Sequence, residues 1–519
     1  MNHTLPTNPP RPSVQDVAYT HGYYRALSPT MLATALEMKG LRAPDLGKPL
    51  NYCELGMGFG VSLIANAACF PHMRFFGNDF NAAHVAYARG LARDAGLHNV
   101  ELFEDCFEQM LERALPPMDF IVLHGIYSWV SPCLRQVIVD FIKARLKPGG
   151  VVYVSHNTLP GWATLMPLRE LFNLHAWRTS PASMSSADRA KKAWEFVNEM
   201  GKRSPAYFVA NPGVAERLRM LNEADHRYMA HEYFNPDWHP LYFHQVAQEM
   251  SAAQLLHAGP AHLEDQVEAT SFSPATREHL ATIDDPILRE TLCDYHLNRG
   301  FRRDLYTRGA ELLSPAERDA KNLDRLWALV TARADVDAEP PCDCEGAALI
   351  DARSYAHLLD ALAEGAASAR ELLERTTLAP LDAERLIQVL MLMCGAGHVQ
   401  PALPQPPCTV AQDSADRFNS VSLSRSTDDG LHQLVSSLTG QATGWTRMAM
   451  LQISLHQQGI VEADAMAQAM HARLVSEGRP VTIRGSTLHG EDAILAHLRD
   501  AAQVFINKEV PLLRNMGVL

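Results

Sequence analysis

The sequence is poor in the features that would place it in a membrane, in an oxidising compartment or around a metal. Its 519 residues include only nine cysteines, and the one close pair, Cys342 and Cys344, has no second pair to complete a metal site. The longest apolar run, residues 389–397, has nine residues, whereas a membrane-spanning helix needs about 20. The first 14 residues lack the cationic and apolar regions of a secretory signal. We expect free thiols, no metal, no membrane insertion and a cytoplasmic location.

Positive charge is also in short supply. Lys and Arg number 46 against 59 Asp and Glu, which gives a formal net charge of −13. This balance argues against broad, charge-driven binding to nucleic acid or to an anionic membrane. The apolar share of 47% and the charged share of 20% are those of an ordinary globular protein. At about 150 residues per domain, the length predicts three or four domains.

Proline-rich and acidic stretches indicate where these domains end. Residues 1–14 are rich in proline, residues 335–343 are acidic and contain prolines, and residues 401–407 read PALPQPP. The predicted parts are a flexible arm (1–14), a first domain (15–175), a helical middle domain (176–335) and a C-terminal domain (345–519) with a winged-helix-like module (350–405).

The first domain has the pattern of an α/β fold. Five short apolar runs, NYCEL, RFFGND, VELFED, DFIVLH and VVYVSH, are each followed by a helix-like or turn-like segment. Strands separated by crossovers predict a Rossmann-like domain with a mostly parallel sheet and helices on both faces. Farther along, the chain is predicted to be mostly helical, with helices at residues 187–201, 214–225, 242–253 and 286–298.

The module at residues 350–405 has the order helix, short helix, helix and strand-like tail. Its candidate recognition segment, residues 381–395, has Asp382, Glu384 and a single Arg385 instead of a basic face. We therefore expect a packing or interaction module and no nucleic-acid partner.

A glycine-rich turn follows the first predicted strand. The segment Glu54-Leu-Gly56-Met-Gly58-Phe-Gly60 lies between NYC and the helix-like VSLIANAACF. Its glycines permit a tight turn and a close approach of a ligand to the backbone. A dinucleotide site would favour GxGxxG, whereas the spacing here is GxGxG after an acidic residue.

This motif resembles the first motif of class I S-adenosylmethionine-dependent methyltransferases. By the resemblance, Glu54 balances the cationic methionine part of the cofactor. Asp79 ends the second strand 19 residues after Gly60, where an acid accepts both ribose hydroxyls. Asp105 follows the third strand and can accept from the adenine amino group. Each acid alone could be a helix cap or a solvated turn residue, but three at successive strand ends indicate S-adenosyl-L-methionine.

Two loops after the fourth and fifth strands carry candidate acceptor-site residues. They read HGIYSWV from His124 and HNTLPGW from His156, and in an open α/β sheet such loops face the ligand. Aromatic faces can hold the stem and charge of a lysine, and polar groups can orient its nitrogen. The candidate aromatic walls are Tyr127, Trp129 and Trp162, and the candidate polar groups are His124, His156 and Asn157. Packing is the alternative role for each of them.

A narrower resemblance rests on these loops together with YTHGYY (19–24), HEYFN (231–235) and WHPLYF (238–243). They look like bacterial methyltransferases with a methyltransferase regulatory domain, a family that includes protein-lysine methyltransferases of outer-membrane proteins. The resemblance implies that Tyr19 and Tyr24 close over the cofactor, that the middle domain borders the active site and that the C-terminal domain handles a protein substrate. It is also compatible with a homodimer. One position departs from the family pattern, because His156 stands where a tyrosine is common.

The sequence therefore predicts an S-adenosylmethionine-dependent methyltransferase, an N-methyltransferase that acts on protein lysine by in-line displacement. An outer-membrane or surface protein is the acceptor that the resemblance implies. Two alternatives stay open: methylation of a small molecule or natural-product peptide, and a non-catalytic scaffold that keeps a cofactor-binding fold.

Overall fold

The computed structural model describes residues 21–181, 183–203, 205–221, 229, 232–235, 237–375, 382–404, 408–426, 430–483 and 486–519. The predicted arm at residues 1–14 lies outside these ranges. Within them, no helix combines the length and the apolar character that crossing a membrane requires.

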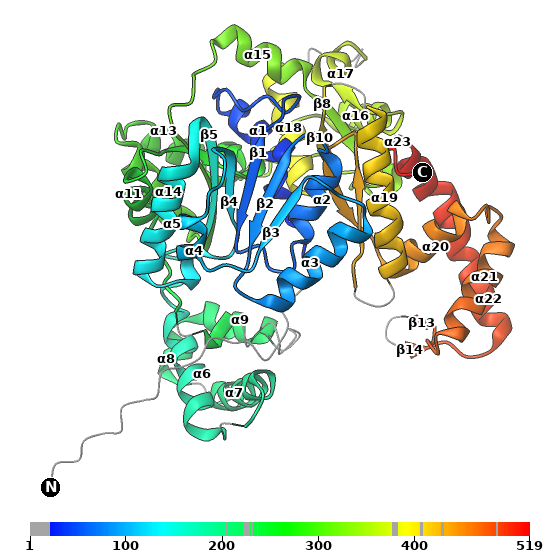
Figure 1. Cartoon of the computed structure of the whole chain (residues 1–519), viewed down its shortest axis with the longest axis horizontal. Helices are drawn as coiled ribbons and strands as arrows, with labels where there is room; N and C mark the ends of the chain where they lie inside the picture. The colour runs from blue at the N-terminus through cyan, green and yellow to red at the C-terminus, as the bar shows by residue number, and fades with distance from the viewer. Residues whose placement is uncertain are drawn as a thin grey trace.

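A seven-stranded sheet forms the centre of the protein (Figure 1), in the order β3-β2-β1-β4-β5-β7-β6. All five predicted strands are confirmed, and they pair in parallel. Their bounds are β1 (Asn51–Leu55), β2 (Arg74–Asn78), β3 (Val100–Phe103), β4 (Met118–Leu123) and β5 (Leu146–Asn157). The connecting helices are α2 (Val61–Cys69), α3 (Ala82–Asp94), α4 (Phe107–Glu112) and α5 (Pro132–Arg145).

The two faces of the sheet are buried in two separate apolar cores. Alternate residues of a strand point to opposite faces, so that Tyr52, Val122 and Tyr153 belong to one core, whereas Cys53 and Val154 belong to the other. Burial on both faces explains why the central strands read as nearly continuous apolar runs. The carboxyl ends of β1, β4 and β5 meet at one edge of the sheet.

Two strands from the predicted middle domain complete this sheet, and the sequence did not predict either of them. They are β6 (Leu256–Pro260) and β7 (Phe301–Thr307), and β7 pairs antiparallel with both β5 and β6. The middle domain, predicted to be mostly helical, thus also contributes two strands to the sheet of the first domain, across the boundary predicted between residues 175 and 176. Short, polar strands such as FRRDLYT do not show the apolar pattern of the central strands.

The four predicted helices of the middle region are confirmed within the described residues. They are α7 (Ser186–Gly201), α9 (Pro212–Leu221), α11 (Phe243–Ser251) and α14 (Pro286–Leu297). In Figure 1, α6 (Met166–Thr179), α7, α8 (Ala206–Ala210) and α9 form a group of their own below the sheet. Other helices near the sheet are α1 (Pro29–Met38), α12 (Glu268–Ser271), α13 (Pro274–Ala281) and α15 (Pro315–Asp324).

The C-terminal region begins with three helices and a small sheet. Its helices are α16 (Ala352–Ala363), α17 (Ala369–Arg375) and α18 (Ala383–Gly395), and its strands β8 (Leu326–Leu329), β9 (Ala367–Ser368) and β10 (Val399–Ala402) pair in the order β10-β8-β9. The helix order agrees with the expectation for residues 350–405, and the winged-helix assignment stays a prediction. The remaining elements are α19 (Thr409–Arg425), α20 (Arg447–Gln457), α21 (Ala463–Ser476), α22 (Glu491–Val504), α23 (Val510–Asn515), and the hairpins β11 (Gln433–Ser436) with β12 (Gln441–Gly444) and β13 (Thr482–Ile483) with β14 (Ser486–Thr487).

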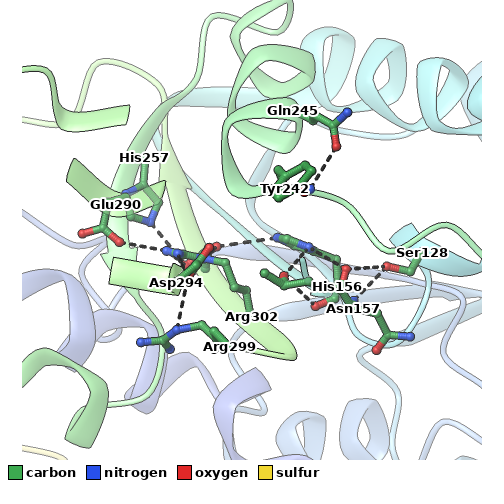
Figure 2. Close-up of polar contacts among 12 residues, drawn as sticks. Ser128, His156, Asn157, Tyr242, Gln245, His257, Glu290, Asp294, Arg299 and Arg302 are labelled. Atoms are coloured by element: carbon green, nitrogen blue, oxygen red, sulfur yellow. Dashed lines mark hydrogen bonds and ion pairs between the residues drawn. The ribbon is translucent and has the colours of Figure 1, made fainter. Parts of the chain in front are cut away.

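A buried group of charges fixes β7 against β5 and α14 (Figure 2). Arg302 on β7 is only 2% exposed, and its guanidinium nitrogens lie 2.7 Å from carboxylate oxygens of Asp304 and Asp294 and 2.9 Å from Glu290. Burial alone would raise the pKa of Asp304, but the charge of Arg302 and a hydrogen bond from His257 hold that pKa well below its usual range. A buried cation with three carboxylates keeps its charge because its partners compensate for lost hydration.

Replacement of Arg302 by methionine tests this linkage. The variant leaves three buried carboxylates without their shared cation, and we expect the free energy of unfolding to fall by about 3–5 kcal/mol. Urea unfolding at pH 7 measures the change. The control Arg277→Met, in which a partly exposed arginine on α13 is replaced, is expected to stay within about 0.5 kcal/mol of the parent chain. A loss below 1 kcal/mol for Arg302→Met would contradict the role of this cluster.

Candidate functional site

The glycine-rich loop between β1 and α2 leaves its backbone open at one point. Gly56, Gly58 and Gly60 all have positive φ angles, of 69°, 57° and 69°. A Cβ atom at Gly56 would lie 2.4 Å from Ile126 Cδ1, so that only glycine fits there, whereas a Cβ at Gly58 would meet nothing within 4 Å. The loop therefore packs tightly on one side and exposes backbone to a ligand at Gly58.

Glu54 at the end of β1 is a buried carboxylate without a counter-charge. It is 4% exposed, and its Oε2 atom has no hydrogen-bond partner among the described residues. Burial raises the pKa of Glu54 to about 8. An isolated carboxylate is costly to bury, and a bound cation would lower that cost. This position fits the cationic methionine part of S-adenosylmethionine.

The structure places Asp79 against the glycine loop. Asp79 is buried, and its Oδ2 accepts a hydrogen bond of 3.0 Å from the Gly58 N–H. Its Oδ1 accepts from the Asn81 N–H at 2.8 Å and lies 3.2 Å from His84 Nδ1. The carboxylate is thus held next to Gly58 of the glycine loop, and its ribose-binding role stays a prediction.

Asp105 has a different surrounding from the other two acids. Its carboxylate accepts from Arg113 Nε at 2.6 Å, and its backbone oxygen accepts from Asn78 Nδ2 at 2.9 Å. An adenine amino group would share this carboxylate with Arg113, and the role of Asp105 stays a prediction.

Phe80, directly after Asp79, is a candidate that the sequence analysis missed. Its side chain is 65% exposed, which is unusual for a large aromatic residue. A flat, exposed ring next to the acid that is predicted to bind ribose is suited to stack on a base. The aromatic residue that follows the acid of RFFGND was the only indication in the sequence.

Tyr24 and His124 lie together at the carboxyl end of β4. Their ring centroids are 4.0 Å apart, and the Tyr24 N–H donates to Ser62 Oγ on α2. His124 Nδ1 lies 2.9 Å from the Tyr153 hydroxyl. Burial lowers the pKa of His124 to about 3, with further lowering by the charge of Arg303, so its imidazole is neutral at pH 7. Tyr19, the other predicted lid residue, lies outside the described residues, as does His231 of the HEYFN motif.

His156 and Asn157, at the end of β5, point to opposite faces of the sheet. His156 is 1% exposed, lies 2.9 Å from Thr158 Oγ1 through Nδ1 and 3.9 Å from Asp304 through Nε2, and faces the charged cluster (Figure 2). Burial lowers its pKa to about 4. His156, which stands where the family commonly has a tyrosine, therefore contacts the charged cluster. We assign it no role in the acceptor site.

Asn157 has its amide on the other face. The side chain is 5% exposed, and its Nδ2 has no hydrogen-bond partner among the described residues. Its backbone N–H donates to Ser128 Oγ at 2.8 Å, which fixes the end of β5 against the loop after β4. A buried, unpaired amide at this edge is available to a ligand.

Three tryptophans gather beside these loops. The ring of Trp238 lies 4.9 Å from that of Trp162 and 6.3 Å from that of Trp129, centroid to centroid. The Arg169 guanidinium lies 4.4 Å from the centre of the Trp238 ring, so one of these three tryptophans already forms a cation–π contact. Two of the predicted aromatic walls are thus brought together, with Trp238 as a third member that the sequence analysis did not assign to the site.

Tyr127 does not join the tryptophans. It is fully buried in the opposite apolar core, where its hydroxyl donates to Glu249 on α11. Arg135 forms an ion pair with the same carboxylate. This surrounding gives Tyr127 a packing role, which was the alternative for it, and we leave it out of the acceptor site.

Two family models match the chain. A "Methyltransferase domain" matches residues 53–150, and a "Predicted methyltransferase regulatory domain" matches residues 225–308. The chain is 37% identical over 506 residues to the uncharacterized protein sll1526 of Synechocystis, which covers 97% of this chain and 98% of that protein. It is 27% identical over 293 residues to RP789 of Rickettsia prowazekii, covering 56% of this chain and 51% of that protein.

A solved structure shares the fold over nearly the whole chain. PKMT2 from Rickettsia typhi, in complex with AdoHcy, aligns with a TM-score of 0.73 at 18% identity and covers 96% of this chain and 99% of its own. The fold described above, including the C-terminal region, is therefore the fold of that protein.

Replacement of Glu54 by glutamine tests the cofactor site through stability as well as binding. In wild type the folded-state pKa of about 8 lies above the ordinary 4.5. Between these pH values the folded chain keeps a proton on Glu54 that the unfolded chain loses, so the stability of the fold decreases as pH rises from 4.5 to 8. Without ligand, Glu54→Gln should therefore be the more stable chain at pH 7, by up to about 3 kcal/mol, with the difference vanishing towards pH 4.5.

Saturating S-adenosylmethionine should reverse this order, because it stabilises wild type and leaves the variant nearly unchanged. Urea unfolding at several pH values, with and without ligand, provides the measurement. A ligand-free variant that is less stable at pH 7, or one that keeps its affinity, argues against a partnerless Glu54 as the cation site.

Proposed function

Because the chain belongs to the class I S-adenosylmethionine-dependent methyltransferases that carry a methyltransferase regulatory domain, we propose that it methylates lysine side chains of proteins. The cofactor supplies, when bound, a methyl group on a cationic sulfur. The remaining requirements fall on the chain itself, which must hold the acceptor nitrogen in line and lower the cost of removing its proton.

The tryptophan group carries this proposal. Trp129 lies in the loop that follows β4, Trp162 in the loop that follows β5 and Trp238 in the segment before α11, and Trp238 contacts both other rings. Indole faces hold both the apolar stem and the charge of a lysine. Two backbone hydrogen bonds join the segment of Trp238 to the ends of the other two loops: the His239 N–H donates to Ser128 O, and the Leu241 N–H donates to Asn157 O. A lysine stem along these rings would place its nitrogen towards the polar ends of β4 and β5.

The polar groups there suit an amine acceptor. A neutral His124 does not repel a cationic lysine, but its low pKa makes it a weak base. Burial lowers the pKa of the lysine, and its proton passes to solvent. The Asn157 amide then orients the free amine. The new N–C bond forms as the S–C bond breaks.

The likeness to PKMT2 over almost the full length supports a protein acceptor. An outer-membrane or other surface protein as that acceptor, a cytoplasmic location and a homodimer belong to the proposal on the family resemblance alone. The C-terminal region, which no methyltransferase motif covers, is the part assigned to the protein substrate.

Removal of one ring tests the acceptor wall. Trp129→Ala should leave S-adenosylmethionine affinity within about twofold and lower kcat/KM for the acceptor by about tenfold or more, because a desolvated cation–π contact is lost. Trp129→Phe keeps a ring and should recover part of the rate. Calorimetry and a methyl-transfer assay supply the two numbers. Unchanged turnover in Trp129→Ala would remove this residue from the acceptor site.

The acceptor itself is identified by labelling. Purified full-length protein is incubated with methyl-labelled S-adenosylmethionine and fractionated cell material, and labelled species are analysed by mass spectrometry, with Glu54→Gln as the control. We expect label on lysine side chains of protein. Label confined to low-mass extract would replace this proposal with a small-molecule acceptor, and cofactor binding without any labelled species would favour the scaffold.

A further inference from the structure

Two neighbouring arginines of β7 lie in opposite electrostatic surroundings. The charge of Arg302 is matched by Glu290, Asp294 and Asp304, and Arg299 shares Asp294 at 3.2 Å (Figure 2). Because side chains alternate along a strand, Arg303 points to the other face of the sheet. The carboxylates of this cluster therefore form no ion pair with Arg303.

Arg303 is half-buried and has no carboxylate within ion-pair distance in the part of the chain that the structure describes. Its guanidinium carbon lies 4.8 Å from the centre of the Phe301 ring. Arg303 lies on the Tyr153 side of the sheet, because it pairs with Ser155, two residues after Tyr153 on β5. Burial and, to a lesser degree, the charge of Arg303 lower the pKa of His124. A partly desolvated cation without a counter-ion favours the binding of an anion.

The strand register places Arg303 on the same face as Glu54. Glu54 pairs with Val122 of β4, and Val122 pairs with Tyr153 of β5. Two residues after Tyr153, Ser155 pairs with Arg303, and its Oγ accepts from the Gly125 N–H beside His124. The two strands that carry Glu54 and Arg303 are three strand spacings apart in the sheet, about 14 Å between backbones.

The partnerless charges on this face are of opposite sign. Glu54 provides a buried negative group, and Arg303 provides a positive group beyond the Tyr24–His124 pair. An α-amino acid in zwitterionic form has the complementary pair of charges, an ammonium and a carboxylate on one carbon. Neither site is completed by the chain's own residues, and a single ligand of this kind would complete both.

The geometry points to Arg303 as the residue that binds the α-carboxylate of the cofactor's methionine part, opposite Glu54 at its cationic groups. This rests on the cofactor assignment and is independent of which acceptor is methylated. Arg303 belongs to the segment matched by the regulatory-domain model. That domain then supplies part of the cofactor site itself, and β7 has one arginine for structure and one for ligand.

The test compares two ligands that differ only in the carboxylate. Calorimetry on the full chain measures the affinity of S-adenosylmethionine and of its decarboxylated analogue, S-adenosylmethioninamine. Arg303→Met should weaken S-adenosylmethionine binding about 10- to 100-fold, as expected for loss of a charge-assisted hydrogen bond. The decarboxylated analogue should change by less than about twofold. Arg303→Lys should recover part of the loss, and Arg277→Met should change neither affinity.

Because the ratio of the two affinities is taken within one protein, a general loss of folding affects both ligands alike and is recognised. An equal loss for both ligands in Arg303→Met and in Arg303→Lys would overturn the proposal, as would unchanged affinity for S-adenosylmethionine. A variant with unchanged affinities but a shifted pH–rate profile would also overturn it, since Arg303 would then act on the acceptor. Failure of lysine methylation would leave these affinities untouched.

Discussion

The antiparallel pairing of β5 with β7 is the contact on which the rest of the site depends. It joins the parallel sheet of the methyltransferase domain to the segment matched by the regulatory-domain model. One face of the pair holds His156 against the buried cluster of Arg302 and Asp304, and the other presents Asn157 and Arg303 at the edge where β1 and β4 also end. The regulatory segment is therefore part of the catalytic sheet and not an attachment to it.

The two faces of the sheet at this strand pair carry polar groups with different surroundings. On the face of the cluster, the Arg302 guanidinium has three carboxylate partners, Glu290, Asp294 and Asp304. On the other face, Glu54 and the Asn157 amide have unpaired buried atoms among the described residues. Unpaired buried polar groups destabilise a fold, and proteins keep such groups chiefly at functional sites. We propose that ligand binding offsets this cost.

The fold of the first domain could be predicted from the sequence because the relevant information is local. The five apolar runs, the glycine turn and the acids at strand ends each occupy a few consecutive residues, and a parallel sheet brings their ends together. Strands β6 and β7 could not be predicted in this way, because β7 is placed by its pairing with β5, more than 140 positions away, and β6 by its pairing with β7. Site residues divide similarly. Trp129 and Trp162 were predicted from their loops, and their role in the acceptor site stays a prediction. Tyr127 is a core residue, and Arg303 is distinguished from Arg302 by the face of the sheet that it occupies.

We propose that strands from the methyltransferase domain and from the regulatory domain together form one cofactor site. Hydrogen–deuterium exchange with and without S-adenosylmethionine tests it most directly, since amide protection reports local stabilisation. We expect S-adenosylmethionine to increase amide protection both in the glycine loop, at residues 54–60, and in β7 with the turn before it, at residues 299–305. Protection confined to the loop and the end of β2, with β7 unchanged, would contradict it.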